Sequence, residues 1–62
     1  MTHLKVICDF DYSPKLMPIA EILAWRDWSE REREAIDLVV RGELRRFSTS
    51  YNGVFCDLER AS

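Results

Sequence analysis

Hydrophobic and polar residues alternate in the last third of the chain, on both sides of an Asn-Gly pair. Asn-Gly favours a two-residue hairpin turn, because that turn needs positive φ at both central positions. With this turn at Asn52-Gly53, one face of the hairpin is largely apolar and pairs Tyr51 with Val54, Thr49 with Cys56 and Phe47 with Leu58. The other face pairs Ser50 with Phe55, Ser48 with Asp57 and Arg46 with Glu59. Turn chemistry and alternation select the same register, so the sequence predicts a β-hairpin here.

A second alternating segment covers residues 3–12. One face of this segment carries Leu4, Val6, Cys8, Phe10 and Tyr12, and the other carries Lys5, Ile7, Asp9 and Asp11. Period-two alternation of β-branched and aromatic residues predicts a half-buried strand. Ser13-Pro14 ends this strand, Pro14 and Pro18 indicate a connection, and Pro18 suits the first position of a helix.

The middle of the chain has helical spacing. The apolar residues of 19–28 predict a short helix that is apolar around much of its circumference, and Ser29 with Glu32 forms a capping box for a second helix that runs to about Arg41. Gly42 is well placed to adopt the left-handed conformation that ends this second helix. A single fused helix would be about 36 Å long, too long for the predicted strand to cover, so a break near Trp28-Ser29 is favoured.

These patterns predict a single α+β domain over residues 1–62, with the element order strand, helix, helix, strand, strand. We expect a small three-stranded, mainly antiparallel sheet with both helices packed on one face. The first strand pairs either antiparallel with the second strand or parallel with the third, and the sequence leaves this open.

The amino-acid composition predicts that the protein self-associates. The chain has 62 residues, of which 47% are hydrophobic, and it carries two Trp, two Tyr and three Phe. So short a chain buries a thin core, so this apolar content predicts a homodimer. The net charge of -2 combines nine basic and eleven acidic residues and gives no general attraction to nucleic acid or anionic lipid. No secretory signal or membrane span is recognised, so the expected location is the cytoplasm, without membrane contact.

The two cysteines, Cys8 and Cys56, both fall on predicted inner faces. Free cysteine is among the most buried residue types, so we expect small buried hydrophobes, while a disulfide requires Cα atoms within about 7 Å. With His3 they make too few ligands, too widely spaced, for structural zinc. Both glycines are explained as helix stop and hairpin turn, which leaves no Gly-rich phosphate loop. We therefore expect no metal and no cofactor.

The run Val6-Ile7-Cys8-Asp9-Phe10-Asp11 resembles the first motif of the haloacid dehalogenase-like phosphatases. That resemblance implies a nucleophilic role for Asp9 and a general acid/base role for Asp11, beside Mg²⁺. The chain departs from the family at Tyr12-Ser13-Pro14, where Gly-Thr is usual, and it is too short for the parallel sheet that the family needs. The sequence thus favours a protein that is not an enzyme.

Protein binding is the function that the sequence favours. Trp25 and Trp28 belong to the residue types enriched in interface hot spots, and Arg26 and Arg31 flank them. Ile7 and Phe55 lie on the predicted outer face of the sheet and make a second candidate surface. We expect a non-catalytic inhibitor or adaptor that occludes a surface of a larger macromolecule, with these six residues as interface candidates.

The alternative is a small nucleic-acid-binding regulator, since two helices followed by a hairpin resemble a winged helix. It requires the basic residues Arg31, Arg33, Arg41, Arg45 and Arg46. The second helix also exposes Glu30, Glu34 and Asp37, which repel phosphates, so nucleic acid is the less favoured partner.

Overall fold

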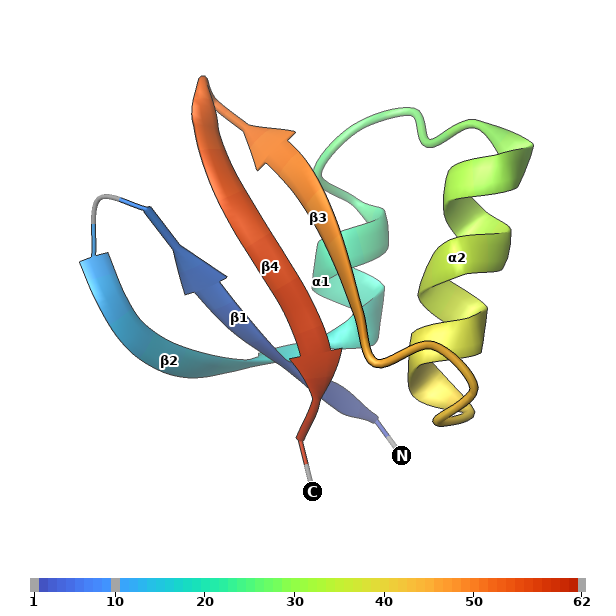
Figure 1. The fold of residues 1–62 in the computed structure, drawn as a ribbon. Helices are drawn as coiled ribbons and strands as arrows, with labels where there is room; N and C mark the ends of the chain where they lie inside the picture. Colours follow the sequence, from blue (N-terminus) through green and yellow to red (C-terminus); the bar gives the residue numbers. More distant parts are fainter. Residues whose placement is uncertain (1, 10, 62) are drawn as a thin grey trace.

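The structure is a computed structural model that describes residues 2–9 and 11–61, with Tyr12 described by its backbone only. It contains four strands and two helices: β1 (His3–Cys8), β2 (Asp11–Pro18), α1 (Ile19–Leu23), α2 (Glu30–Val40), β3 (Arg46–Tyr51) and β4 (Val54–Arg60). All neighbouring strands are antiparallel, in the order β2-β1-β4-β3 (Figure 1). The predicted three-stranded sheet and β-α-α-β-β order are therefore wrong, and the observed order is β-β-α-α-β-β.

The missed strand is β2, which contains both residues that predicted a connection, Pro14 and Pro18. The alternating segment 3–12 does not continue as one strand; it reverses after Cys8, and the returning segment pairs with β1. Proline is tolerated in a strand at the edge of a sheet, where its missing N–H faces solvent. Phe10 and the side chain of Tyr12, both predicted on the inner face, lie outside the described residues.

The C-terminal hairpin has the predicted register, including Tyr51 opposite Val54 and Thr49 opposite Cys56. Asn52 and Gly53 have φ values of 53° and 78°, as the predicted turn requires. The first strand follows neither expected pairing, since β1 lies antiparallel to β4. The reason is β2, which reverses the chain once more before the helices begin.

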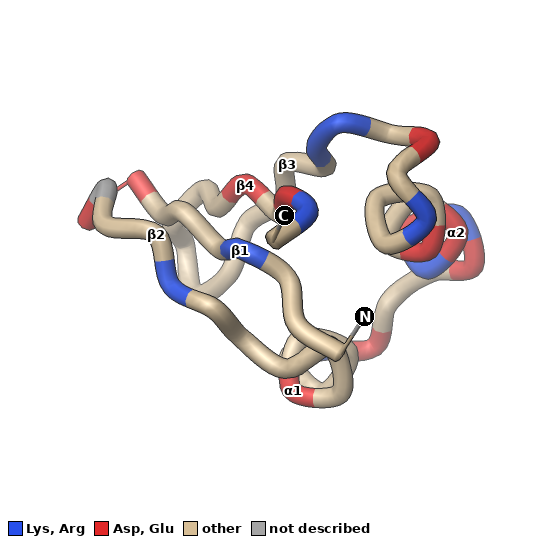
Figure 2. The backbone as a smooth tube through the Cα atoms, turned by 90° about the horizontal axis from the view of Figure 1, so that it is seen from below, with Lys and Arg blue, Asp and Glu red and all other residues tan. Residues whose placement is uncertain are grey.

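The helices cover one face of the sheet, as expected (Figures 1 and 2). The inner face of the two central strands contributes Leu4 and Val6 from β1, and Cys56 and Leu58 from β4. From the opposite layer, the helices and their connection add Ile22, Trp28, Ile36 and Val39 to the same buried cluster. At about 1.5–3 kcal/mol for each large apolar side chain, this cluster is the main stabilising element.

The first helix is shorter than predicted. It ends at Leu23, and residues 24–29 form a linker that carries Trp25, Arg26 and Trp28. The amides of Ala24 and Trp25 donate to the carbonyls of Glu21 and Ile22, both at 3.1 Å, which tightens the last turn.

The second helix agrees with the prediction. The hydroxyl of Ser29 accepts from the Glu32 amide at 3.1 Å, and the Glu32 carboxylate accepts from the Ser29 amide at 2.8 Å. Gly42, with φ 80°, follows the helix as its left-handed terminator. No helix in the described ranges is long and apolar enough to span a membrane.

The cysteines form a disulfide, so the expectation of two buried thiols is wrong. Cys8 and Cys56 face each other across β1 and β4, and their Cα atoms are 4.0 Å apart. The Asp9 amide donates to the Phe55 carbonyl at 2.9 Å, which makes Cys8 and Cys56 a non-hydrogen-bonded pair, the closer kind of antiparallel pair. Register decided this bond, and the sequence had left the register of β1 open.

Candidate protein-binding site

The linker between the helices places its two tryptophans differently. The side chain of Trp28 is buried in the core, where its indole N–H donates to the Ile22 carbonyl at 3.0 Å. That carbonyl, in the last turn of α1, also accepts from the Trp25 amide at 3.1 Å, so the indole is its second donor. Trp28 is therefore a structural residue, and of the two tryptophans predicted as interface candidates only Trp25 is partly accessible.

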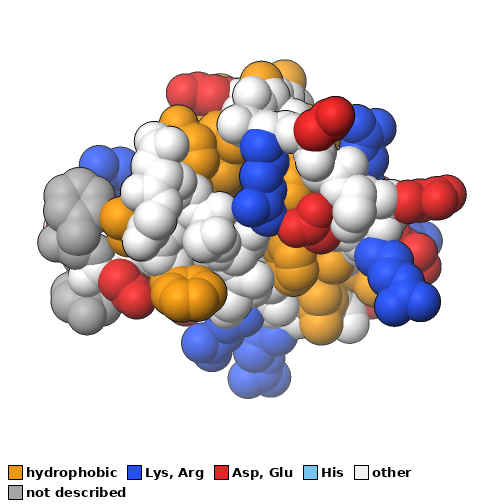
Figure 3. All heavy atoms as spheres, turned by 90° about the horizontal axis from the view of Figure 1, so that it is seen from above, with side chains coloured by type: hydrophobic (Ala, Val, Ile, Leu, Met, Phe, Trp, Pro, Cys, Tyr) orange, Lys and Arg blue, Asp and Glu red, His pale blue; other side chains and the backbone are white. Residues whose placement is uncertain are grey.

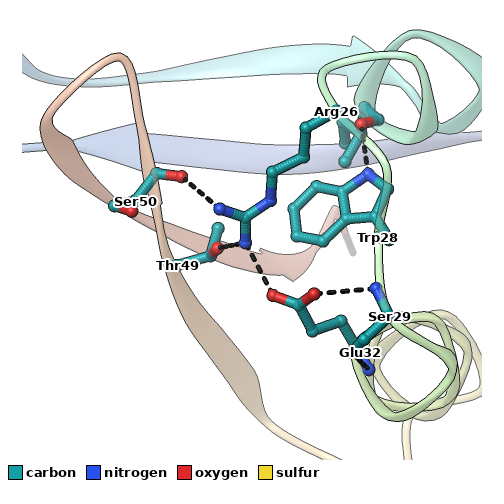
Figure 4. Close-up of polar contacts among 7 residues, drawn as sticks. Arg26, Trp28, Ser29, Glu32, Thr49 and Ser50 are labelled. Atoms are coloured by element: carbon teal, nitrogen blue, oxygen red, sulfur yellow. Dashed lines mark hydrogen bonds and ion pairs between the residues drawn. The ribbon is translucent and has the colours of Figure 1, made fainter.

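Arg26 fastens the linker to the sheet and to α2 (Figure 4). Its Nη2 donates to Glu32 Oε2 at 2.7 Å and to Thr49 Oγ1 at 2.6 Å, and its Nη1 donates to the Ser50 carbonyl at 3.2 Å. The guanidinium also lies 4.3 Å from the centre of the Trp28 ring. These contacts hold the linker against β3 and set the position of the adjacent Trp25.

Glu32 serves both this network and the helix cap. Its pKa is below the usual value, chiefly because the Ser29 backbone N–H donates to it, with the nearby Arg26 guanidinium as a smaller cause. The carboxylate is thus ionised at neutral pH and accepts from both groups.

Trp25 stacks on Tyr51 at the end of β3. Their ring centres are 4.3 Å apart and the rings are inclined by 19°, an arrangement close to offset stacking. Trp25 is half-buried and Tyr51 is 36% exposed. Trp25 from the linker and Tyr51 from the tip of the C-terminal hairpin thereby form one aromatic wall, which is partly exposed to solvent.

This wall borders a cleft on the inner face of the sheet. Its volume is about 170 Å³, and its lining includes Val6, Cys8, Lys15, Met17, Trp25 and Tyr51. The cleft lies where the helices do not cover β1 and β2. Figure 3 shows hydrophobic side chains that reach the surface at this end of the molecule, among charged ones. The disulfide contributes to its floor through Cys8.

The size of the cleft limits what it can hold. Sites for drug-sized ligands and cofactors usually measure about 300–1,000 Å³, whereas a cavity of about 150 Å³ holds one benzene ring. A volume of about 170 Å³ therefore matches one aromatic or branched aliphatic side chain. Such a shape suits an anchor residue of a protein partner.

The titratable groups at the rim are Asp11 and Lys15. The pKa of Asp11 is lowered, first because the Ser13 amide donates to its carboxylate at 3.1 Å. Lys15 Nζ lies 3.9 Å from the other oxygen and adds to the effect. Asp11 is consequently ionised at neutral pH and is not a proton donor there.

The phosphatase-like motif does not form the corresponding site. The family needs a parallel sheet, whereas this sheet is antiparallel throughout, and Asp9 lies in the turn after β1 while Asp11 begins the returning strand. Within residues 2–9 and 11–61, no group of three or more His, Cys, Asp or Glu side chains is arranged to hold a metal ion.

The remaining predicted interface residues lie away from the cleft. Ile7 and Phe55 share the outer face of the sheet, on neighbouring strands, and Phe55 is 63% exposed. Arg31 is exposed on α2. The structure thus brings Trp25, Arg26 and Trp28 together at the linker and places Ile7 and Phe55 on the opposite face of the sheet.

Two of the five arginines of the nucleic-acid alternative lie beside carboxylates. Arg41 lies 3.2 Å from Asp37 and 3.4 Å from Glu43, and Arg46 lies within 4.0 Å of two carboxylates. Charges of both signs also alternate along α2 (Figure 2). Positive charge compensated in this way offers little attraction for a phosphate backbone.

Sequence reasoning missed Tyr51, Lys15 and the disulfide as parts of the site. Tyr51 precedes the Asn-Gly turn on the apolar face of the hairpin, which was a usable signal for an aromatic residue at the end of the core. Lys15 carries no signal in the sequence, because Pro14 and Pro18 predict a connection there. Comparisons with protein families, curated proteins and solved structures give no match for this chain.

Proposed function

We propose that the protein is a small non-catalytic protein-binding module that captures one protruding side chain of a larger partner in the cleft beside Trp25. By covering the surface around that side chain, the module acts as an inhibitor or an adaptor, and it does so as a homodimer. The observation that carries the proposal is the partly exposed Trp25–Tyr51 stack next to an apolar cleft of about 170 Å³.

The chemistry of the cleft supports recognition of a side chain and its backbone. The stacked rings and the side chains of Val6 and Met17 offer apolar contact, which supplies most of the affinity in hot-spot pockets. Lys15 and Asp11 at the rim provide one donor group and one acceptor group for the backbone of the partner. The Arg26 network keeps the aromatic wall in place, so little ordering is required on binding.

The groove between α1 and α2 is larger, about 400 Å³, and it includes Leu23, Ile36 and Val40. Its lining among the described residues includes no aromatic side chain, however, whereas Trp and Tyr are the residue types enriched in hot spots. For this reason we assign recognition to the cleft. Cytoplasmic localisation stays a prediction, and the disulfide argues against it, because disulfides persist mainly in oxidising compartments.

The test selects linear peptides from a random library against the oxidised protein and measures their binding to variants. Trp25→Ala should weaken the selected peptides roughly 30-fold, the loss of about 2 kcal/mol that is typical of a hot spot. Phe55→Ala is the control, since it removes a more exposed aromatic residue from the other face of the sheet. Peptides that bind wild type and Trp25→Ala equally well would refute the assignment of the cleft.

Trp28→Ala is not a suitable variant for this test. The indole is 5% exposed and its N–H donates to the Ile22 carbonyl, so the substitution should destabilise the fold itself, by about 3–5 kcal/mol.

A further inference from the structure

The sheet has two edges, and they differ in how well they resist pairing with another strand. The Ile19 amide donates to the Thr2 carbonyl at 2.9 Å, so residues 19, 17 and 15 direct their backbone groups toward β1. The backbone groups of the alternate residues Pro14, Leu16 and Pro18 therefore point away from the sheet. Two of these three residues have no N–H. Proline is a common means of blocking an edge strand, and β2 is protected in this way.

The other edge is β3, which contains no proline. The bond from the Asp9 amide to the Phe55 carbonyl shows that residue 55 directs its backbone groups toward β1. Residues 54, 56 and 58 therefore direct theirs toward β3, where they meet Tyr51, Thr49 and Phe47. It follows that Arg46, Ser48 and Ser50 point their N–H and C=O groups outward, away from the sheet.

Only one of these outward groups has a hydrogen-bond partner among the described residues. Arg26 Nη1 donates to the Ser50 carbonyl at 3.2 Å, so this carbonyl, near the C-terminal end of β3, is not free to pair with another strand. The backbone groups of Arg46 and Ser48 have none in the described chain, and both residues are exposed. An open edge without proline is a template for strand addition.

The flank of α2 next to this edge is partly apolar. Arg33, Asp37 and Val40 lie on the side of α2 that borders the groove toward α1. At 3.6 residues per turn, Arg31, Ala35 and Leu38 lie on the opposite side of the helix and face away from α1. Figure 1 shows α2 standing at the β3 side of the sheet. Ala35 and Leu38 are only half-buried there, and a neighbour on the β3 edge would cover them.

We infer that a second copy of this chain pairs with the β3 edge, antiparallel and about a two-fold axis, so that the two sheets become one continuous sheet. This inference rests on the self-association in the proposed function and names its interface, which is separate from the Trp25 cleft. An isologous pairing of this kind is closed, because each edge is used once.

One register satisfies the free groups and keeps Arg26 in place. With Phe47 opposite Phe47 of the second copy, Arg46 lies opposite Ser48 of the second copy, and Ser48 lies opposite its Arg46. Each of these hydrogen-bonded pairs exchanges two backbone bonds, and the Ser50 carbonyl stays with Arg26.

Charge also favours this register. Ser48 is small and donates to Asp57 of its own chain at 2.6 Å, so the Arg46 opposite it extends across the hydroxyl toward that carboxylate. Within one chain, Arg46 Nη1 is 3.8 Å from Asp57 Oδ2, which shows that the two groups already interact on this face. The two Arg46 side chains are not placed directly opposite each other.

The experiment measures solution mass by sedimentation equilibrium over a range of micromolar concentrations. The wild-type protein should be a dimer, and Ser48→Pro, which removes an outward N–H, should raise the dimer dissociation constant about tenfold or more. Leu16→Pro is the matched control, since it removes an outward N–H from the β2 edge, and it should leave the dimer intact. A monomeric wild type, or a Ser48→Pro dimer of unchanged affinity, would overturn the inference.

A second measurement covers the case in which Ser48→Pro does not fold. Amide hydrogen exchange of the wild-type protein should show Arg46 and Ser48 protected at high concentration and exchanging faster on dilution. Concentration-independent exchange at these two amides would exclude the β3 interface without any variant. Peptide binding at the cleft is unaffected in either outcome, so failure of this interface is distinguishable from failure of the Trp25 assignment.

Discussion

Reduction of the Cys8–Cys56 disulfide should remove a large part of the stability of this protein. The two cysteines are separated by 48 positions in the sequence, so the bond closes a loop that contains most of the chain. In the chain-entropy treatment, a loop of that length destabilises the unfolded state by about 4 kcal/mol at 25 °C. A 62-residue domain has a total stability of about 3–9 kcal/mol, so the reduced protein should be marginally stable.

Urea denaturation followed by tryptophan fluorescence provides the assay, because Trp28 is buried in the folded protein. With a slope of about 1 kcal/mol per molar urea, as expected for a small domain, reduction should lower the midpoint by about 4 M. The oxidised and reduced wild type have the same side chains, so the difference isolates the bond.

The control is the double variant Cys8→Ala/Cys56→Ala, whose midpoint should not respond to the reductant. The reasoning would be refuted if reduction moved the wild-type midpoint by less than about 1 M. Two free thiols in the unreduced, denatured wild-type protein would also contradict the structure.

Two further predictions concern the ends of α2. The pKa of Glu32 is lowered in the folded state, so the stability that this carboxylate contributes is present above its usual pKa of 4.5 and is lost as the pH falls through the folded pKa. The wild-type protein should therefore lose more stability below pH 4.5 than Glu32→Gln. Parallel acid-unfolding curves of the two proteins would contradict this. Gly42→Ala should cost about 1 kcal/mol or more in urea denaturation, because φ is 80° and the added Cβ would meet the Arg60 guanidinium. Gly53→Ala, with φ 78° and no neighbouring atom, is its control and should cost less, so equal losses would show that Arg60 moves aside freely.

Sequence patterns predicted the structure correctly where the interacting residues lie within one short segment. The Asn52-Gly53 turn sets its own backbone angles, and alternation then sets which residues of the hairpin face the core. The capping box between Ser29 and Glu32 likewise involves only neighbouring residues, and it placed the start of α2 correctly. Both features depend on interactions within a few residues, which the sequence displays directly.

The sequence did not predict β2, because this strand is stabilised by its pairing with β1, which local patterns do not show. The two prolines in the segment gave a stronger local signal, for a connection. Pro14 and Pro18 are compatible with a strand only at an edge, with their nitrogens directed outward, and edge position is a property of the assembled sheet. The helix predicted to reach Trp28 failed for a related reason. The indole of Trp28 and the guanidinium of Arg26 satisfy tertiary partners, the Ile22 carbonyl, Thr49 and Glu32, which compete with further helical turns.

The chain on its own thus specified an α+β domain, the hairpin register, the second helix and an inward face for Leu58 and Cys56, because each follows from local backbone preferences and side-chain alternation. Only the assembled fold made β1 a neighbour of β4, which bonded Cys8 to Cys56 and left β3 at an open edge. It also stacked Trp25 on Tyr51 and so created the cleft. These contacts join residues that are distant in sequence, and their free energy depends on strand order, which periodicity does not encode.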